Sequence, residues 1–100
     1  MQTLKKLEII IEKRDLEKVI EVLEDLKVPF YQIIKEVTGK DFKGVKVTED
    51  MKDSFKNCII TTVISEELVN KIKVQLNEEF TKRSGLCIVY NNVESVSEIF

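Results

Sequence analysis

Two short segments of the sequence combine glycines with cationic side chains, a combination suited to binding an anion. The first is a loop that holds two glycines and three lysines at three-residue spacing: Gly39, Lys40, Lys43, Gly44 and Lys46. The second holds Lys82, Arg83 and Gly85. Glycine lets backbone N–H groups approach a ligand closely, and ammonium and guanidinium groups donate charge-assisted hydrogen bonds. The two segments are therefore candidates for the two sides of a phosphate-binding site.

Each segment also has a purely structural interpretation. The lysine loop lacks the Gly-Lys-Ser/Thr sequence that opens a helix in a P-loop, so it could be an ordinary solvated loop. Lys82 and Arg83 could simply complement the dipole at the C-terminus of a helix. The choice depends on whether the fold brings the two segments together.

The composition is that of a single domain with no general attraction for nucleic acid. One hundred residues, 43% of them hydrophobic, are enough for one compact unit spanning 1–100. The 16 basic and 18 acidic residues give a net charge of −2, so any anion site must be local. Without histidine, a metal site lacks its usual ligands, and no nucleophile and base can be paired, so we expect neither a metal centre nor an enzyme. No apolar run approaches the roughly 20 residues that cross a bilayer, so we expect a cytoplasmic protein.

The strands are predicted from alternating hydrophobic residues. Leu7, Ile9 and Ile11 form the apolar face of a first strand, which is mixed on its other face. Runs rich in β-branched and aromatic residues predict further strands at 30–38, 55–64 and 86–90, and the tail at 91–100 has no clear pattern.

The helices are predicted from helical spacing and from capping residues. The first covers 16–26, with Asp15 as a plausible N-cap and Pro29 as the residue that prevents further winding. The second follows Ser65, its predicted N-cap, and ends before Gly85, which we expect to be a left-handed C-terminal cap.

The resulting order, βαββαβ, predicts an α+β ferredoxin-like fold: a four-stranded antiparallel sheet with both helices on one face. In that topology the first and second strands run in one direction and the third and fourth in the other. The end of the first strand at 12–14, the long loop at 39–54 and the segment 81–85 then meet at one edge of the sheet. We therefore expect the cationic segments to converge.

The other face of this sheet has no helix to cover it. Ile10, Ile34 and Ile59 or Ile60 would leave apolar surface there, which favours a homo-oligomer. Cys58 and Cys87 lie in hydrophobic runs, where thiols usually behave as small buried hydrophobes. We expect the first strand to separate the two cysteines, which would prevent an intrachain disulfide.

Three parts of the sequence resemble the PII-like signalling proteins. Residues 7–20 are similar to the opening strand and helix of that family, the loop at 39–54 to its T-loop, and residues 80–90 to the short phosphate-side loop of the branch associated with bicarbonate and carbon metabolism. The resemblance implies a homotrimer that binds adenine nucleotides in clefts between subunits. It further implies a T-loop that regulates a partner, which in this family can be a membrane transporter, such as one for bicarbonate.

The sequence departs from the nitrogen-sensing members of that family. There is no tyrosine between Gly39 and Ser54 for uridylylation, no Thr-Gly-x-x-Gly-Asp-Gly-Lys phosphate loop, and no arginine pair near Phe100. Fewer cations fit fewer phosphates, so the expected ligand is AMP or ADP rather than ATP or cyclic AMP, with bicarbonate as a further candidate and no required cofactor.

The resemblance also implies roles for individual residues. The predicted nucleotide-binding set comprises the loop base and the phosphate side: Gly39, Lys40, Gly44, Lys46, Thr81, Lys82, Arg83 and Gly85. The adenine is expected near Gln32 and Ile64, and the partner is expected to contact Phe42, Lys43 and Met51. The alternative is an ACT-like oligomeric module that senses a small molecule or binds a partner without a nucleotide.

Overall fold

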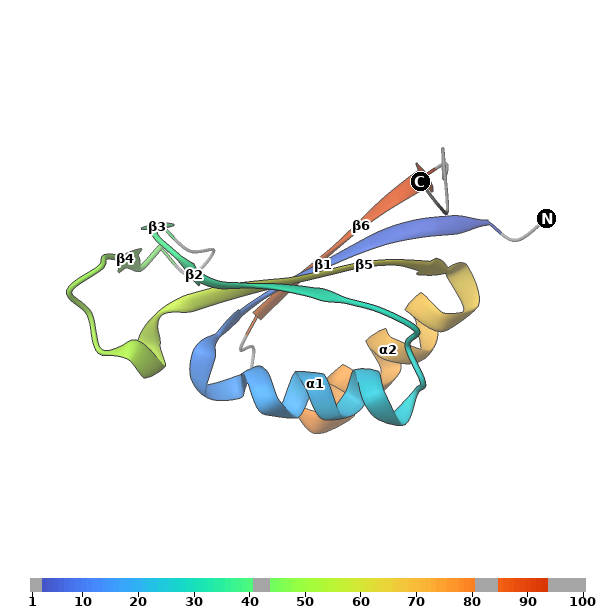
Figure 1. Ribbon diagram of the computed structural model, residues 1–100, viewed down its shortest axis with the longest axis horizontal. Helices are drawn as coiled ribbons and strands as arrows, with labels where there is room; N and C mark the ends of the chain where they lie inside the picture. Colours follow the sequence, from blue (N-terminus) through green and yellow to red (C-terminus); the bar gives the residue numbers. More distant parts are fainter. Residues whose placement is uncertain (1–2, 41–43, 81–84, 94–100) are drawn as a thin grey trace.

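The computed structural model describes residues 3–40, 44–80 and 85–93 (Figure 1). The main elements are strands β1 (Leu4–Glu12), β2 (Gln32–Val37), β5 (Asn57–Ser65) and β6 (Gly85–Val93), and helices α1 (Leu16–Asp25) and α2 (Glu66–Glu79). Smaller elements are strands β3 (Gly39–Lys40) and β4 (Lys46–Val47) and the 3-10 turns η1 (Lys13–Asp15) and η2 (Asp53–Phe55). None of the helices in the described part of the chain is long and apolar enough to cross a membrane.

The main sheet has the strand order β2-β5-β1-β6, and every pair of neighbours is antiparallel. Both helices lie on one face of this sheet (Figure 1). The predicted ferredoxin-like βαββαβ fold, its strand directions and its strand order are therefore confirmed. β1 separates the cysteines, because Ile9 pairs with Cys87 on one side and Ile11 pairs with Cys58 on the other.

The helix-covered face contains the hydrophobic core. Alternate residues of β1 and β5 point toward the helices and are buried, and they meet the apolar stripes of α1 and α2, which are set by helical spacing. The fully buried members of this core include Leu7, Val19, Leu23, Cys58, Ile60, Val69 and Ile72.

The two helices begin differently. Ser65 Oγ accepts a hydrogen bond from the Leu68 N–H at 3.3 Å, which confirms Ser65 as the N-cap of α2. Asp15 precedes α1, but its side chain makes no capping bond, so that prediction is wrong in its mechanism. The reason is that Asp15 closes η1 and has a helical backbone, with φ −100° and ψ −1°, rather than the extended backbone of an N-cap.

Gly85 is not the helix cap that the sequence suggested. α2 ends at Glu79, and Gly85 is the first residue of β6, paired with Ile11. Among the described glycines, positive φ occurs at Gly39 and Gly44. Gly85 is needed instead because β6 approaches β1 closely at this position. A Cβ at residue 85 would lie 2.5 Å from the Ile10 carbonyl oxygen. β6 also extends to Val93, so 91–93 belong to a strand rather than to the predicted tail.

The open face of the sheet carries apolar side chains, as expected. Ile10 and Ile59 are half-buried and directly opposed, and Ile34 is 54% exposed. Ile60 points into the core instead. The expectation of two buried thiols is wrong for Cys87, which is exposed because the edge strand β6 receives less cover than the strand that carries the buried Cys58.

Candidate functional site

A concavity of about 240 Å³ lies on the open face where the long loop leaves the sheet. Its floor is a row of three apolar side chains from adjacent strands, since Ile10 of β1 pairs with Ile59 of β5 and with Leu86 of β6. Its wall is the segment Val37–Lys40, which continues β2 into β3. The fold thus places the start of the lysine loop over an apolar floor next to the start of β6.

Polar groups reach this concavity from two directions. Thr38 and Lys40 line it from the loop, and Asn57 lines it from the first position of β5. Asn57 is only 8% exposed. Lys40 is the charged member of the lining among the described residues, so the concavity combines an apolar floor with one ammonium and one buried amide. That combination suits a partly apolar anion.

The loop itself is a short hairpin rather than an open coil. Gly39 pairs with Val47, and Lys40 pairs directly with Lys46, so the two lysine side chains leave the same side of the ribbon. Gly39 and Gly44 have φ of 143° and 86°, which side chains other than glycine rarely adopt. Opposed like charges destabilise a hairpin, and a bound anion would relieve that repulsion.

The return limb of the loop is fixed to the end of β1. Lys13 Nζ donates to both carboxylate oxygens of Asp53 at 3.1 Å, and the Lys13 N–H donates to the Lys56 carbonyl at 2.8 Å. The Arg14 guanidinium lies over the Phe55 ring, 5.1 Å from its centroid. The predicted meeting of 12–14 with the long loop is therefore confirmed.

Nearby charges on the sheet are already paired. Glu12 Oε2 lies 2.6 Å from Arg14 Nε. Lys56 Nζ lies 2.5 Å from Glu36 Oε1, and this hydrogen bond raises the pKa of Lys56. Lys40 is consequently better placed than Lys56 to meet a ligand's negative charge.

The structure brings together one part of the predicted nucleotide set. Gly39 and Lys40 line the concavity, Gly44 and Lys46 complete the same hairpin, and Gly85 precedes Leu86 in the floor. The predicted residues Thr81, Lys82 and Arg83 and the partner-loop residues Phe42 and Lys43 lie outside the described residues.

Three other predicted residues lie apart from the concavity. Gln32 pairs with Thr61, and Ile64 pairs with Lys5, both toward the opposite end of the sheet. The Ile64 side chain is 3% exposed and belongs to the helix-side core, so it does not face the concavity. Met51 is half-buried, and its sulfur accepts a hydrogen bond from the Thr48 N–H at 3.2 Å.

The lining also contains residues that sequence reasoning did not assign to the site: Ile10, Val37, Thr38, Asn57, Ile59 and Leu86. Ile10 and Ile59 were identified only as uncovered apolar surface. Both residues alternate with the core residues of their strands at a period of two, and this pattern is the signal that could have placed their side chains together on the open face. Nothing in the local sequence marks Asn57.

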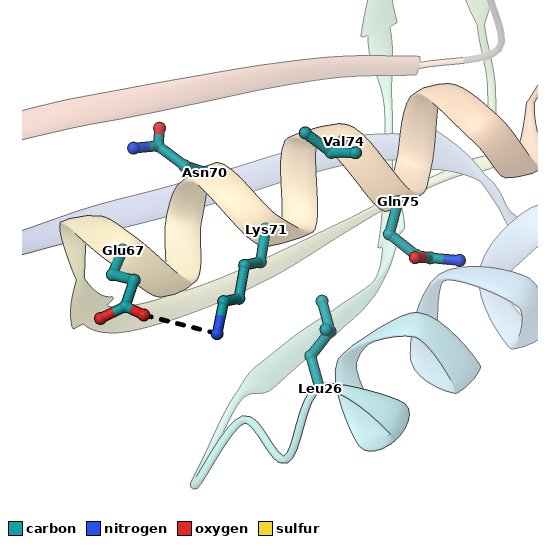
Figure 2. Close-up of a pocket in the computed structure, with 6 residues that line it drawn as sticks. All are labelled: Leu26, Glu67, Asn70, Lys71, Val74 and Gln75. Atoms are coloured by element: carbon teal, nitrogen blue, oxygen red, sulfur yellow. Dashed lines mark ion pairs between the residues drawn. The ribbon is translucent and has the colours of Figure 1, made fainter.

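Two other hollows are weaker candidates. The groove in Figure 2 lies between the end of α1 and the face of α2, where the Glu67 and Lys71 side chains pair with each other at 3.4 Å. A second hollow is lined by Glu36, Thr38 and Glu49, and its acidic lining would repel an anion. Of these three hollows, the concavity at the loop base is the one that joins an apolar surface to a lysine with no ion pair among the described residues.

Comparison with known proteins identifies the family of this chain. The family model described as Nitrogen regulatory protein P-II matches residues 4–99. The chain belongs to the P-II family. This P-II chain has the family's fold over nearly its whole length, and the resemblance predicted from the sequence is confirmed. No match was found among the curated proteins.

Solved structures give the same result. The P-II chain is 29% identical to CPII, a nitrogen regulatory PII-like protein from Thiomonas intermedia K12 bound to ADP, AMP and bicarbonate, with a TM-score of 0.76 over 88% of this chain and 84% of that one. It is 27% identical to CPII from the same organism bound to ADP, AMP and acetate. That match has a TM-score of 0.69 and covers 89% of this chain and 85% of that one. The chain also shares its fold with PII from Arabidopsis thaliana bound to citrate, at 15% identity. That match has a TM-score of 0.67 and covers 90% of this chain and 78% of that one.

Proposed function

We propose that this P-II protein is a non-enzymatic regulator that binds AMP or ADP, with bicarbonate as a further ligand, in clefts between the protomers of a homotrimer. Its long loop, 39–54, then controls a partner in inorganic carbon metabolism, such as a bicarbonate transporter in the membrane. The protein acts from the cytoplasm. The ligands follow those of the similar CPII structures.

The observation that carries the proposal is the concavity at the loop base. It joins Gly39, Lys40 and Leu86 from segments distant in the sequence over one apolar floor. Its volume of about 240 Å³ is below the roughly 300–1,000 Å³ of most ligand sites. A second protomer packed on the apolar open face would supply the missing wall, which supports a site shared between protomers.

The hairpin supports a switching mechanism. A phosphate beside Lys40 and Lys46 would offset the repulsion between these opposed ammonium groups and stabilise the β3–β4 pairing. The ligand then shifts the population of loop conformations by its preference for the paired form. Phe42, Lys43 and Met51 are the proposed partner contacts, and release of Met51 from its bond to Thr48 would expose an apolar side chain to the partner.

Calorimetric titration of AMP, ADP, ATP and cyclic AMP into the purified protein tests this proposal. We expect ADP and AMP to bind more tightly than ATP or cyclic AMP. Lys40→Ala and Arg83→Ala should each weaken ADP binding by roughly 10- to 100-fold, since each removes a charge-assisted hydrogen bond. Lys71→Ala, a lysine of the α2 surface, is the matched control and should leave binding unchanged.

Two results would contradict the assignment of the site. One is the absence of adenine nucleotide binding at any submillimolar concentration. The other is parental affinity in both the Lys40 and the Arg83 variant.

A further inference from the structure

The return limb of the long loop, residues 46–56, is folded through successive turns and ends against the body of the protein. The Met51 N–H donates to the Thr48 carbonyl at 3.3 Å, and within η2 the Phe55 N–H donates to the Lys52 carbonyl at 3.0 Å. η2 then lies against η1, at the end of β1 (Figure 1). The position of the limb therefore depends on the contacts between these two short turns.

Three kinds of contact join η1 to η2. The first is an ion pair with two hydrogen bonds, in which Lys13 Nζ donates to both carboxylate oxygens of Asp53 at 3.1 Å. The second is a backbone bond, from the Lys13 N–H to the Lys56 carbonyl at 2.8 Å. The third is a cation–π contact, because the Arg14 guanidinium lies 5.1 Å from the centroid of the Phe55 ring. Two successive cations of the body thus contact one turn of the loop.

Glu12 holds the guanidinium of Arg14 in place. Glu12 Oε2 is buried and makes no hydrogen bond of good geometry among the described residues, but it lies 2.6 Å from Arg14 Nε. A buried carboxylate without a compensating charge is unfavourable. Glu12 and Arg14 are therefore expected to stay together on the body whether or not Phe55 is in contact with them.

The groups that the loop contributes are more exposed than those of the body. The Asp53 side chain is 72% exposed and that of Lys13 only 21%, and Phe55 is 42% exposed. One exposed ion pair or cation–π contact shifts an equilibrium by only about 1.5- to 5-fold. Segments held by such contacts open more readily than a buried core does. The boundary between η1 and η2 is consequently the place where the return limb can separate from the body.

We propose that Lys13 and Arg14 form an electrostatic latch, which holds the return limb on its own protomer and releases it when Asp53 and Phe55 leave them. The closed latch keeps the limb that carries the half-buried Met51 on the body. The latch is thereby an autoinhibitory contact, which limits the access of a partner to the loop. This consequence for a partner rests on the proposed function, whereas the latch itself requires neither a nucleotide nor a partner.

Amide hydrogen exchange followed by NMR, on the purified protein without nucleotide, tests the latch. The Lys13 amide is the reporter, because its bond to the Lys56 carbonyl crosses the boundary. Asp53→Asn should speed its exchange by about 2- to 5-fold, and Asp53→Asn combined with Phe55→Leu by about 10-fold. The Val28 amide, whose hydrogen bond closes the end of α1, should keep its parental rate in both variants.

Ionic strength and a matched variant complete the test. Added NaCl should speed exchange of the Lys13 amide in the parent and have much less effect in Asp53→Asn, because salt screens the ion pair that this variant lacks. Asp50→Asn is the control, since it neutralises an exposed carboxylate of the same limb that interacts with Thr48 rather than with Lys13. It should leave the exchange rate unchanged.

The latch is overturned if Asp53→Asn leaves the Lys13 amide at its parental rate, or if Asp50→Asn speeds its exchange equally. Neither result changes the outcome of the ADP titration. The nucleotide site and the latch can therefore fail separately.

Discussion

The two faces of the main sheet are built from alternate residues of the same strands, yet they differ in how completely they are covered. On the helix-covered face, Ile60 is 1% exposed and the buried Thr62 has a hydrogen-bond partner. On the open face, Ile34 is 54% exposed, and Ile10 and Ile59 are only half-buried. The first face holds the fold together, and the second leaves apolar side chains exposed, where we propose that ligands and other protomers bind.

The largest expected effect comes from adjacent isoleucines on the two faces. Ile60→Ala should lower the free energy of unfolding by roughly 3–4 kcal/mol, because it opens a cavity in the core. Ile59→Ala should lower it by only about 1 kcal/mol, because its side chain is half-buried, but it should weaken ADP binding. Urea denaturation and calorimetry measure both properties. Equal losses of stability would remove the distinction between the faces.

Gly85 tests the junction where β6 joins the floor of the open-face concavity. Gly85→Ala should cost about 1–3 kcal/mol, since its Cβ would meet the Ile10 carbonyl oxygen at 2.5 Å and the two strands must separate. Gly44→Ala, in the hairpin, is the comparison: strain at φ 86° should cost about 1 kcal/mol without disturbing the main sheet. Thermal unfolding compares the variants, and a neutral Gly85→Ala would contradict the close approach.

At the end of α1, on the helix-covered face, we expect a substitution to raise the free energy of unfolding rather than to lower it, and by a smaller amount. Lys27 follows α1 with φ 57°, and the Val28 N–H bonds the Leu23 carbonyl at 3.0 Å, as in a Schellman cap. Lys27→Gly should therefore raise the free energy of unfolding by about 1 kcal/mol, because glycine adopts this conformation without strain. Lys18→Gly within α1 should instead destabilise the protein by a similar amount. A destabilised Lys27→Gly variant would show that the lysine side chain matters more than its backbone.

The smallest expected effect is a loss of stability at high pH, when two hydrogen-bonded tyrosines ionise. The Tyr90 hydroxyl on the open face donates to Glu8 at 3.0 Å, and the Tyr31 hydroxyl donates to Glu24 at 2.7 Å; these bonds raise the pKa of both tyrosines. Their contribution to stability is complete below the ordinary tyrosine pKa of about 10 and is lost as pH rises through the raised values.

Phenolate absorbance followed during alkaline titration resolves the two groups. Glu8→Gln should return the pKa of Tyr90 toward its ordinary value and leave Tyr31 unchanged, and Glu24→Gln should do the reverse. If either variant shifted the pKa of both tyrosines, the two hydrogen bonds would not be independent.

Much of the fold was predictable because local signals agree with long-range pairing. The alternation at Leu7, Ile9 and Ile11 set one buried face, and Ser65 marked a helix start that the structure confirms. Gly85 was misread because a glycine after a basic helix end is typical of a C-terminal cap, whereas pairing with Ile11 determines its conformation. Cys87 was misread because hydrophobic neighbours do not reveal that an edge strand lies beyond full helix cover.

The candidate site was only partly predictable. Gly39 and Lys40, which line the concavity, could be predicted because glycine and lysine have distinctive chemistry in a long loop. Asn57 could not, because its burial depends on Val37–Lys40 passing beside the start of β5, which is a tertiary feature. The pairing of Lys40 with Lys46 was equally hidden, since opposed like charges contradict ordinary strand preferences.

An ADP titration followed by backbone amide NMR tests the location of the site most directly. The site on the open face predicts that shifts concentrate at Gly39, Lys40, Asn57 and Leu86, while Val74 in the α1–α2 groove stays unchanged. The account would be contradicted if saturating ADP shifted the amide signals around Val74 and left those of Gly39 and Lys40 unchanged.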